Sequence, residues 1–251
     1  IIVWYLCRFK TAPLSLSHFR PKLSVTGFVA KLGTANFFNQ IAMMIVQIVM
    51  NKSLTYYGSQ SVYGESIPLA CAGIITKVGM VFFSICIGLS QGMQPIVSFN
   101  YGAGNYKKVK QAYRLAAGIG TIISVIAFFA FQIFPRQLIG IFGSSQNEAY
   151  YTFAVRYFRI YMFFTFLNAI QPISSNFFTA IGKPGKGIFL SLTRQIIFLL
   201  PLIVIFPLFL GVDGIMYAGP IADFIAAMVS MILIYKEFGK INKLEEATCE
   251  S

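Results

Sequence analysis

The sequence is poor in charged residues. Only 11% of its 251 residues are charged, 57% are hydrophobic, and just eight are acidic. A soluble domain carries about 25% charged residues, so this chain lacks the polar surface that a water-soluble protein needs. A large soluble protein with an apolar core is excluded, because the apolar residues fall in blocks near the length of about 20 residues that spans a bilayer.

Residues that hold metals or cofactors are also scarce. The chain has one histidine, His18, and four cysteines, Cys7, Cys71, Cys86 and Cys249, with no CxxC pair. No zinc, haem or iron–sulfur pattern is present, so no cofactor is predicted and the cysteines are interpreted as inert thiols. An intramembrane enzyme needs clustered nucleophiles, bases or metal ligands at membrane depth, and such a cluster is missing, so an enzyme is disfavoured.

Six apolar segments are long enough to cross a bilayer. In lipid a helix satisfies its own backbone hydrogen bonds, so each segment is predicted to be a helix. The segments are Leu32–Met50, Ile67–Gly88, Ala112–Phe134, Tyr157–Ile181, Ile188–Leu210 and Ile215–Tyr235. The predicted fold class is therefore all-α: a polytopic membrane protein with a six-helix transmembrane bundle over residues 32–235.

The segments outside the bundle are short. The apolar run of residues 1–7 has no initiating methionine, and it is interpreted as the truncated end of a transmembrane helix in a longer protein. Residues 8–31 are predicted to be a cytoplasmic linker and residues 236–251 a cytoplasmic tail, disordered from Asn242. The basic segment Asn105–Arg114 is predicted to lie along the membrane surface as a short helix.

Basic residues alternate along the chain in a way that sets its orientation. A net charge of +12 would suggest nucleic acid in a soluble protein, but here Lys and Arg lie mainly between apolar segments. Every second connecting region is rich in them, and cytoplasmic loops collect such residues. The C-terminus is therefore expected in the cytoplasm, with the protein in the cell membrane. The tight turns Gly182–Lys186 and Gly211–Gly214 predict antiparallel neighbouring helices.

One stretch, Gly88–Gly104, combines breakers with amides. It holds Gln91, Gln94, Pro95 and Asn100, and it is predicted to close the second helix at the inner face. Pro95 removes one backbone donor and frees a carbonyl upstream. Two interpretations stay open at this point: a capped helix end, or a hinge or gate.

The same stretch resembles a known family. Its run Gly-Leu-Ser-Gln-Gly-Met-Gln-Pro-Ile, the later Asn-Tyr-Gly-Ala, the turn Asn51–Gly58 and the turn Gly182-Lys-Pro-Gly are similar to those of the multidrug and toxic compound extrusion (MATE) transporters. The resemblance covers about Gly33 to Gly239. It implies a twelve-helix protein of two six-helix bundles around a central cavity, of which this chain would be the second bundle.

The resemblance also implies an activity and partners. The family exports cationic or amphipathic compounds in exchange for H⁺ or Na⁺, so the expected partners are membrane lipid, a small-molecule substrate and the missing N-terminal six-helix half. One departure concerns an acid that some members carry in helix seven. This chain has Asn36, Asn39 and Gln40 there. If that acid binds the coupling ion, the ion site belongs to the missing half.

Charges inside the membrane are costly and are functional candidates by default. Lys77 lies about 15 Å and Asp223 about 14 Å into their helices at about 1.5 Å per residue, so an ion pair between them is predicted. Its role is either a structural lock or an exchange of partners during transport. Arg194, Arg156 and Arg159 lie nearer to helix ends and are expected to extend toward water.

Further polar residues are candidates for the transport pathway. Asn39, Asn168, Gln171 and Asn176 would either line a cavity or hydrogen-bond between helices, and the sequence leaves both open. A lipid-linked oligosaccharide flippase of the same broader superfamily is the alternative function. Flippases tend to have strongly basic cavities, whereas only Lys77 is clearly mid-membrane here, which favours drug efflux. A channel would lack the two-bundle design.

Overall fold

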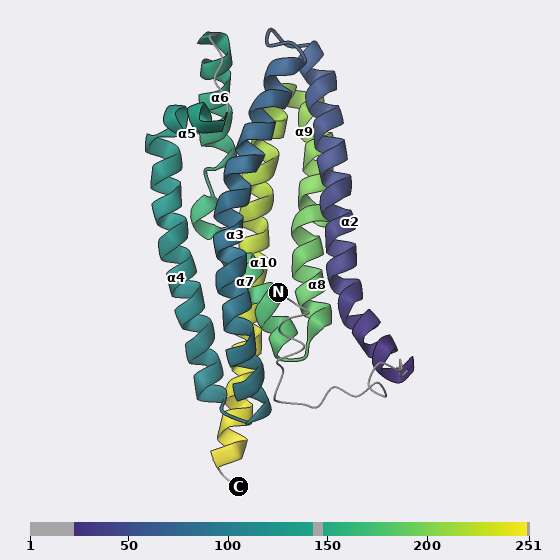
Figure 1. Cartoon of the computed structure of the whole chain (residues 1–251), viewed down its shortest axis with the longest axis vertical. Coiled ribbons are helices and arrows are strands. Elements are labelled where there is room, and N and C mark those ends of the chain that lie inside the picture. The colour runs from purple at the N-terminus through teal and green to yellow at the C-terminus, as the bar shows by residue number, and fades with distance from the viewer. Residues whose placement is uncertain (1–22, 143–147, 250–251) are drawn as a thin grey trace, which may run out of the picture.

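The computed structural model describes residues 23–142 and 148–249, which form helices packed along one long axis (Figure 1). No strand occurs in these ranges, which confirms the all-α class. The six passes are α2 (Leu23–Ser59), α3 (Ser66–Gly102), α4 (Tyr106–Ile133), α6 (Glu148–Tyr161) with α7 (Ile170–Ala180), α8 (Pro184–Leu192) with α9 (Leu200–Leu210), and α10 (Val212–Cys249). A short helix α5 (Pro135–Phe142) joins α4 to the fourth pass.

Four of these passes are continuous helices long and apolar enough to cross a membrane. They are Ser66–Gly102, Tyr106–Ile133, Pro184–Leu210 and Val212–Glu246. The 37-residue α2 and the interrupted α6–α7 pass complete the bundle. The chain is therefore a multi-pass helical membrane protein.

Two glycine turns fix which passes are neighbours. Gly182 and Gly211 adopt φ values of 74° and 58°, a left-handed region that glycine enters without steric cost. Pro184 then opens α8 at its first turn, where its missing N–H is not needed. As predicted, α7 packs against α8 and α9 against α10 as antiparallel neighbours.

The helices run further than their apolar segments. The predicted turn at Asn51–Gly58 is the last part of α2. The stretch Gly88–Gly104 does contain the end of the second helix, as predicted, but α3 ends at Gly102 rather than at Gly88, with Pro95 inside it. The end of an apolar segment marks where the chain leaves the hydrocarbon core, but the helix itself can continue into water with polar residues. The predicted boundaries were wrong for this reason.

Three other predictions about the ends need correction. Asn105–Arg114 is not a separate surface helix: from Tyr106 it is the first part of α4. The tail is helical through Cys249 rather than disordered from Asn242. The predicted linker 8–31 overlaps α2, which begins at Leu23, and the predicted truncated helix of residues 1–7 lies outside the described residues.

The connections sort by charge between the two ends of the bundle. The α3–α4 and α7–α8 turns lie toward the end that carries the C-terminus (Figure 1). Lysines stand at the start of the helix that follows each turn: Lys107, Lys108 and Lys110 in α4, and Lys183 and Lys186 at the start of α8. The α2–α3, α4–α5 and α9–α10 connections lie at the opposite end. The alternation of basic regions along the sequence therefore becomes a basic end and a less basic end of one bundle.

Aromatic rings fill much of the core. Tyr113 of α4 packs edge-on against Phe177 of α7 and Phe238 of α10, with ring centroids 5.0 and 5.3 Å apart. The Tyr113 hydroxyl shares a hydrogen bond of 2.9 Å with Ser174, so its buried polar tip is satisfied. These contacts join α7 of the fourth pass to α4 and α10 through Ser174 and Phe177.

Candidate functional site

The fourth pass is broken inside the bundle. Helix α6 ends at Tyr161, a 3-10 turn η2 spans Thr165–Leu167, and α7 starts at Ile170. The intervening backbone bonds are short-range, such as Asn168 N–H to the Thr165 carbonyl at 3.0 Å. The Met162 carbonyl accepts from both the Thr165 N–H at 3.3 Å and the Thr165 hydroxyl at 2.7 Å. Broken helices at membrane depth are tolerated where they are buried in protein or line a cavity.

Asp223 of α10 lies beside this break. Its side chain is 5% exposed, and both carboxylate oxygens are engaged. The amide of Asn168 donates to Oδ2 at 2.9 Å, and Nε of Arg194 donates to Oδ1 at 2.6 Å. A buried carboxylate is tolerated only when it is paired and hydrogen-bonded. Arg194 of the fifth pass and Asn168 of the fourth pass meet both conditions for Asp223 of the sixth pass.

Arg194 comes from an irregular helix as well. Residues Thr193–Leu199 form a π-helical segment, η3, between α8 and α9. Such widened turns are rare and occur frequently at functional sites. The guanidinium carbon of Arg194 lies 5.3 Å from the ring centroid of Phe83 on α3, a distance that permits a cation–π contact. Arg194 therefore touches Asp223 on one side and the aromatic face of α3 on another.

Close packing holds α10 against the end of α6. A Cβ built on Gly219 would lie 2.4 Å from the Tyr161 ring, so only glycine fits there. Pro220 follows inside α10 and cannot donate a backbone hydrogen bond. Asp223 thus lies one turn beyond Gly219, where α10 packs closely against Tyr161.

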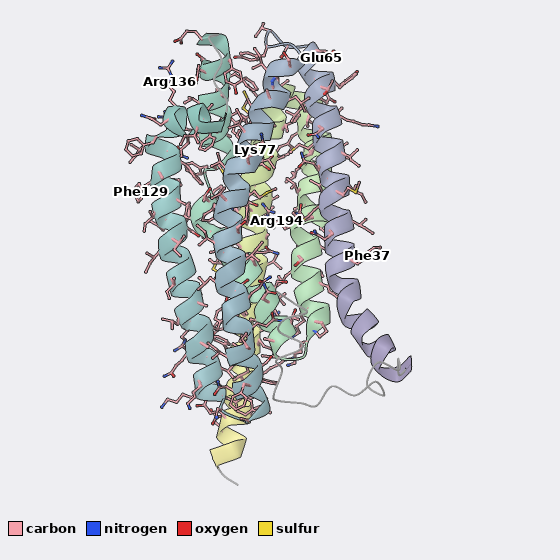
Figure 2. The ribbon with its side chains drawn as sticks, in the orientation of Figure 1. Phe37, Glu65, Lys77, Phe129, Arg136 and Arg194 are labelled. Atoms are coloured by element: carbon pink, nitrogen blue, oxygen red, sulfur yellow. The ribbon has the colours of Figure 1, made fainter. Side chains whose placement is uncertain are left out.

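The predicted ion pair between Lys77 and Asp223 is wrong. Asp223 pairs with Arg194 and Asn168, while Lys77 is exposed and forms no ion pair within the described ranges. Figure 2 places Lys77 closer to the Glu65 end of the bundle than Arg194. The expectation that Arg194 extends to water is also wrong, because its side chain is 17% exposed and bound to Asp223.

The other candidate amides have separate locations. Gln171 donates to the Leu190 carbonyl at 3.3 Å, and Asn176 donates to the Ser90 hydroxyl at 2.7 Å. Both contacts join two passes, so they match the interhelical interpretation. Asn100 bonds to the Ile96 carbonyl of its own helix at 2.8 Å. The side chain of Asn39 lies outside the described part of the structure.

Gln91, Gln94 and Pro95 lie on α3 away from Asp223. Gln91 and Pro95 are exposed and Gln94 is half-buried. Gln91 belongs to a stripe of exposed polar residues with a spacing of seven: Lys77, Ser84, Gln91 and Ser98. This spacing keeps side chains near one face of a helix. Helix α2 carries exposed Gln40, Gln47 and Asn51, spaced by seven and then four residues, which also keeps them near one face of the helix. We call these two sets together the polar face.

The exposed positions of the other passes are different. From Leu115 to Ile133 the exposed side chains of α4 are all apolar: Leu115, Ile119, Ile122, Ile126, Phe129 and Ile133. Along α9 the exposed set is Val204, Ile205, Leu208, Phe209 and Leu210. These faces suit lipid tails. The polar face of α2 and α3 does not.

Lysines bind acids at the basic end. Glu237 of α10 is fully buried and accepts hydrogen bonds from Lys183 and Lys186 of the α7–α8 turn. The hydrogen bond to Glu237 raises the pKa of Lys183. Lys110 of α4 likewise contacts Asn242 and Glu245. These contacts hold the C-terminal part of α10 against the start of α8 and the start of α4. The tail is therefore packed against other helices, which explains why it is helical.

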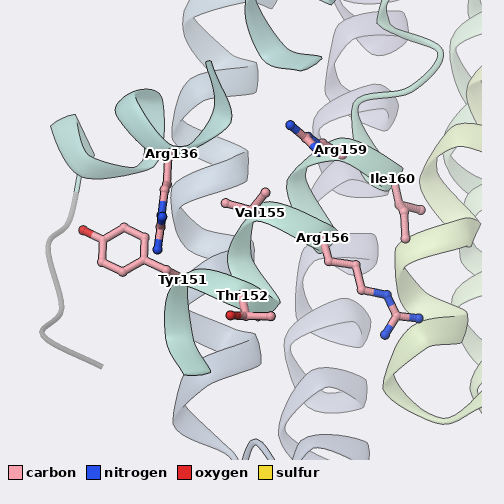
Figure 3. Close-up of a pocket in the computed structure, with 7 residues that line it drawn as sticks. All are labelled: Arg136, Tyr151, Thr152, Val155, Arg156, Arg159 and Ile160. Carbon is pink, nitrogen blue, oxygen red and sulfur yellow. The ribbon is translucent and has the colours of Figure 1, made fainter. Parts of the chain in front are cut away.

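One surface hollow does not include Asp223. It has a volume of about 560 Å³ and is lined by α5 and α6 residues only (Figure 3): Arg136, Tyr151, Thr152, Val155, Arg156, Arg159 and Ile160. Arg136 pairs with Glu148 at 3.2 Å, and Arg156 pairs with Asp213 at 2.9 Å. Its lining includes neither Asp223 nor Arg194, so it is not part of the buried site.

Comparison with known proteins decides the family. The MatE family model matches residues 35–205. The chain belongs to the MatE family. It is 25% identical over 236 residues to the multidrug export protein MepA of Staphylococcus saprophyticus subsp. saprophyticus and 22% identical to MepA of Staphylococcus aureus. Each match covers 93% of this chain and 49% of the relative, so the chain spans about half the length of these curated relatives.

Solved structures show the same fold. A multidrug resistance MATE family transporter of the MOP superfamily in an outward-facing conformation superposes with a TM-score of 0.84 at 19% identity, covering 96% of this chain and 53% of that one. MATE in complex with MaL6 gives 0.83 at 20% identity, covering 96% and 54%. A MOP superfamily transporter from Pyrococcus furiosus, whose binding pocket is described as having reversed polarity, gives 0.84 at 19%, covering 96% and 53%.

Proposed function

We propose that this chain forms one wall of a secondary active exporter. The exporter would move cationic or amphipathic compounds out of the cell in exchange for H⁺ or Na⁺. The MatE family is a family of transporters rather than enzymes, and relatives that match 93% of the chain are named multidrug export proteins. The observation that carries the proposal is the polar face of α2 and α3.

The polar face is too long to be exposed to lipid. Lys77 to Ser98 extends about 31 Å at about 1.5 Å per residue, which matches a hydrocarbon core of about 30 Å. Amides and an ammonium along that length would be costly in lipid. They are tolerable against a water-filled pathway or a second bundle, which the other half of a full-length MatE protein would provide.

The residues beside the polar face suit a drug-sized substrate. Met43 and Met44 of α2 and Met80 of α3 are exposed next to the polar stripes. Methionine is flexible and polarizable, and it recurs at promiscuous binding surfaces. Amides for hydrogen bonds and methionines for adaptable apolar contact together support amphipathic compounds as substrates. Lys77 is the single charge on the described polar face, which favours drug export over a flippase with a strongly basic cavity.

The proposed orientation follows from the basic end. Cytoplasmic segments collect Lys and Arg, and the α3–α4 and α7–α8 turns are basic. We therefore place this end and the C-terminus in the cytoplasm of a cell whose plasma membrane holds the protein.

Cysteine accessibility tests the pathway. In the full-length protein without its native cysteines, Ser84→Cys on the polar face should react with a hydrophilic maleimide, and substrate should slow that reaction. The control Ile122→Cys lies on the apolar face of α4 at comparable depth and should stay unlabelled. Equal labelling of the two positions, or no effect of substrate on position 84, would refute the proposed pathway.

A further inference from the structure

We infer that Asp223 is the binding site for the coupling cation and that Arg194 is a built-in competitor for it. The inference rests on the proposed antiport function. In this structure Arg194 occupies Oδ1 of Asp223 and Asn168 occupies Oδ2. A proton or Na⁺ would bind to Oδ1 as the guanidinium withdraws, so one positive charge replaces another on the carboxylate.

The carboxylate has the capacity for such an exchange. An ionised carboxylate can accept about four hydrogen bonds, and each oxygen of Asp223 has one in the described structure. Arg194 binds through Nε alone, rather than through the two-nitrogen fork that gives arginine–carboxylate pairs their greatest strength. The pair is therefore close and buried, but it is not the most strongly held arrangement that these groups can form.

Arg194 has a second position to occupy. Its guanidinium lies over Phe83, and Phe83 is half-buried, so its ring reaches from the buried pair to the surface of α3 that also carries the polar face. A guanidinium released from Asp223 can thus move along the Phe83 ring toward the polar face while keeping an aromatic contact. Arginine stays charged throughout, so cation binding at Asp223 would present a positive charge to the pathway.

The backbone is irregular in two of the three passes that contribute. Asn168 follows the η2 turn and Arg194 lies in the π-helical η3, whereas Asp223 lies in the continuous helix α10, three residues after Pro220. A structural ion pair needs no such irregularity, since side chains on regular helices pair equally well. Discontinuous helices at membrane depth are the usual framework of ion and substrate sites in transporters.

Two titratable side chains face Asp223 from the passes packed on α10. They are Arg194 of η3 and Tyr161 at the end of α6, which interacts electrostatically with both members of the pair. Asn168 between η2 and α7 is uncharged, and α3 contributes Phe83 to the far side of Arg194. Lys77 is exposed and is not among the partners of Asp223. Removing Arg194 therefore removes the main competitor for the carboxylate.

Transport measurements on the full-length protein in proteoliposomes test the inference. Initial export rates are measured against H⁺ and Na⁺ concentration for wild type, Arg194→Gln and Asp223→Asn. An opposite charge this close typically changes cation affinity at a carboxylate by about tenfold or more. Arg194→Gln should therefore reach half-maximal export at a cation concentration that is lower by about tenfold or more. Export by Asp223→Asn should no longer depend on the cation gradient.

The controls separate this inference from the proposed function. The exposed Arg156→Gln also loses an ion pair and should leave the half-maximal concentration unchanged. Wild type without gradient-driven export would refute the proposed function itself. Gradient-driven export by wild type with an unshifted Arg194→Gln, or with coupling intact in Asp223→Asn, would overturn the inference alone. If a single variant does not fold, the neutral double variant Arg194→Gln/Asp223→Asn decides: gradient-independent export supports the inference, and coupled export overturns it.

Discussion

Arg194 and Asp223 lie 29 residues apart in the chain, yet Nε of Arg194 donates to Oδ1 of Asp223 at 2.6 Å inside the bundle. The two residues belong to passes that are joined by the Gly211 turn and pack as antiparallel neighbours. The pair therefore depends on that packing and also strengthens it.

Breaking the pair from one side should destabilise the protein. Asp223→Ala leaves the Arg194 guanidinium buried and unpaired, which typically costs about 3–5 kcal/mol, so its melting temperature in detergent should fall clearly. The double variant Arg194→Leu/Asp223→Leu removes both charges and should recover most of that loss. The exposed pair offers a control, because Asp213→Ala should cost no more than about 1 kcal/mol. Equal losses for Asp223→Ala and Asp213→Ala would contradict the buried pair.

Lys77 should behave differently from Arg194. Since Lys77 is exposed and Asp223 already has two partners, Lys77→Gln should leave the protein level and the melting temperature unchanged. The charge swap Lys77→Asp with Asp223→Lys should not rescue Asp223→Lys, because the new acid would not reach the new lysine. Recovery of the protein level by this swap would instead support the ion pair between Lys77 and Asp223 that the sequence predicts.

The sequence predicts the number of passes, the two tight turns and the end that collects basic residues, because each depends on local composition. It does not predict partners inside the bundle. Depth along a helix says nothing of the direction in which a side chain points, so the similar depths of Lys77 and Asp223 predict a pair that the structure does not contain.

The correct partner of Asp223 did leave a signal in the sequence. The Gly211–Gly214 turn makes α9 and α10 neighbours. Arg194 lies 17 residues before Gly211 and Asp223 lies 12 residues after it, so their depths differ by only about 7.5 Å at about 1.5 Å per residue. An arginine side chain spans such a distance. The π-helical turn and the break after Tyr161 left no comparable signal, since residues 162–169 contain neither glycine nor proline.

Gly219 provides a test of the packing beneath Asp223. In Gly219→Ala the new Cβ would lie 2.4 Å from the Tyr161 ring, so Tyr161 or α10 must move, and overpacking of this kind typically costs about 1–3 kcal/mol. Gly118→Ala is the matched control: this glycine of α4 has nothing within 4 Å of its built Cβ. We expect a lowered melting temperature for position 219 only, and equal stability of the two variants would contradict the close contact.

The double lysine contact with Glu237 predicts graded effects at the α7–α8 turn. Glu237→Gln weakens both contacts, whereas Lys183→Ala or Lys186→Ala leaves one lysine in place. Amide hydrogen exchange of residues 182–187 should therefore rise most in Glu237→Gln and less in either lysine variant. Single lysine variants that match Glu237→Gln would show that the two contacts are not independent.

The pH dependence of this contact follows from Lys183. The folded state holds the pKa of Lys183 above its ordinary value of 10.5, so its contribution to stability is fully present below about pH 10 and is lost as pH rises through the raised pKa. Hydrogen-exchange protection of the turn, corrected for intrinsic exchange rates, should therefore not fall between pH 7 and pH 9 on account of this lysine. A loss of protection in that range that is absent in Lys183→Ala would contradict the raised pKa.

The proposed orientation makes the final prediction. Lys108 begins α4 at the basic end, and Gln60 lies in the α2–α3 connection at the opposite end. Because cytoplasmic segments collect Lys and Arg, an impermeant thiol reagent applied to intact cells should label Gln60→Cys and not Lys108→Cys. Both variants are made in a full-length protein without its native cysteines, and both should react after the cells are permeabilised, which shows that each thiol is accessible. Labelling of position 108 but not of position 60 in intact cells would reverse the orientation and place the Glu237 contacts and the C-terminus outside.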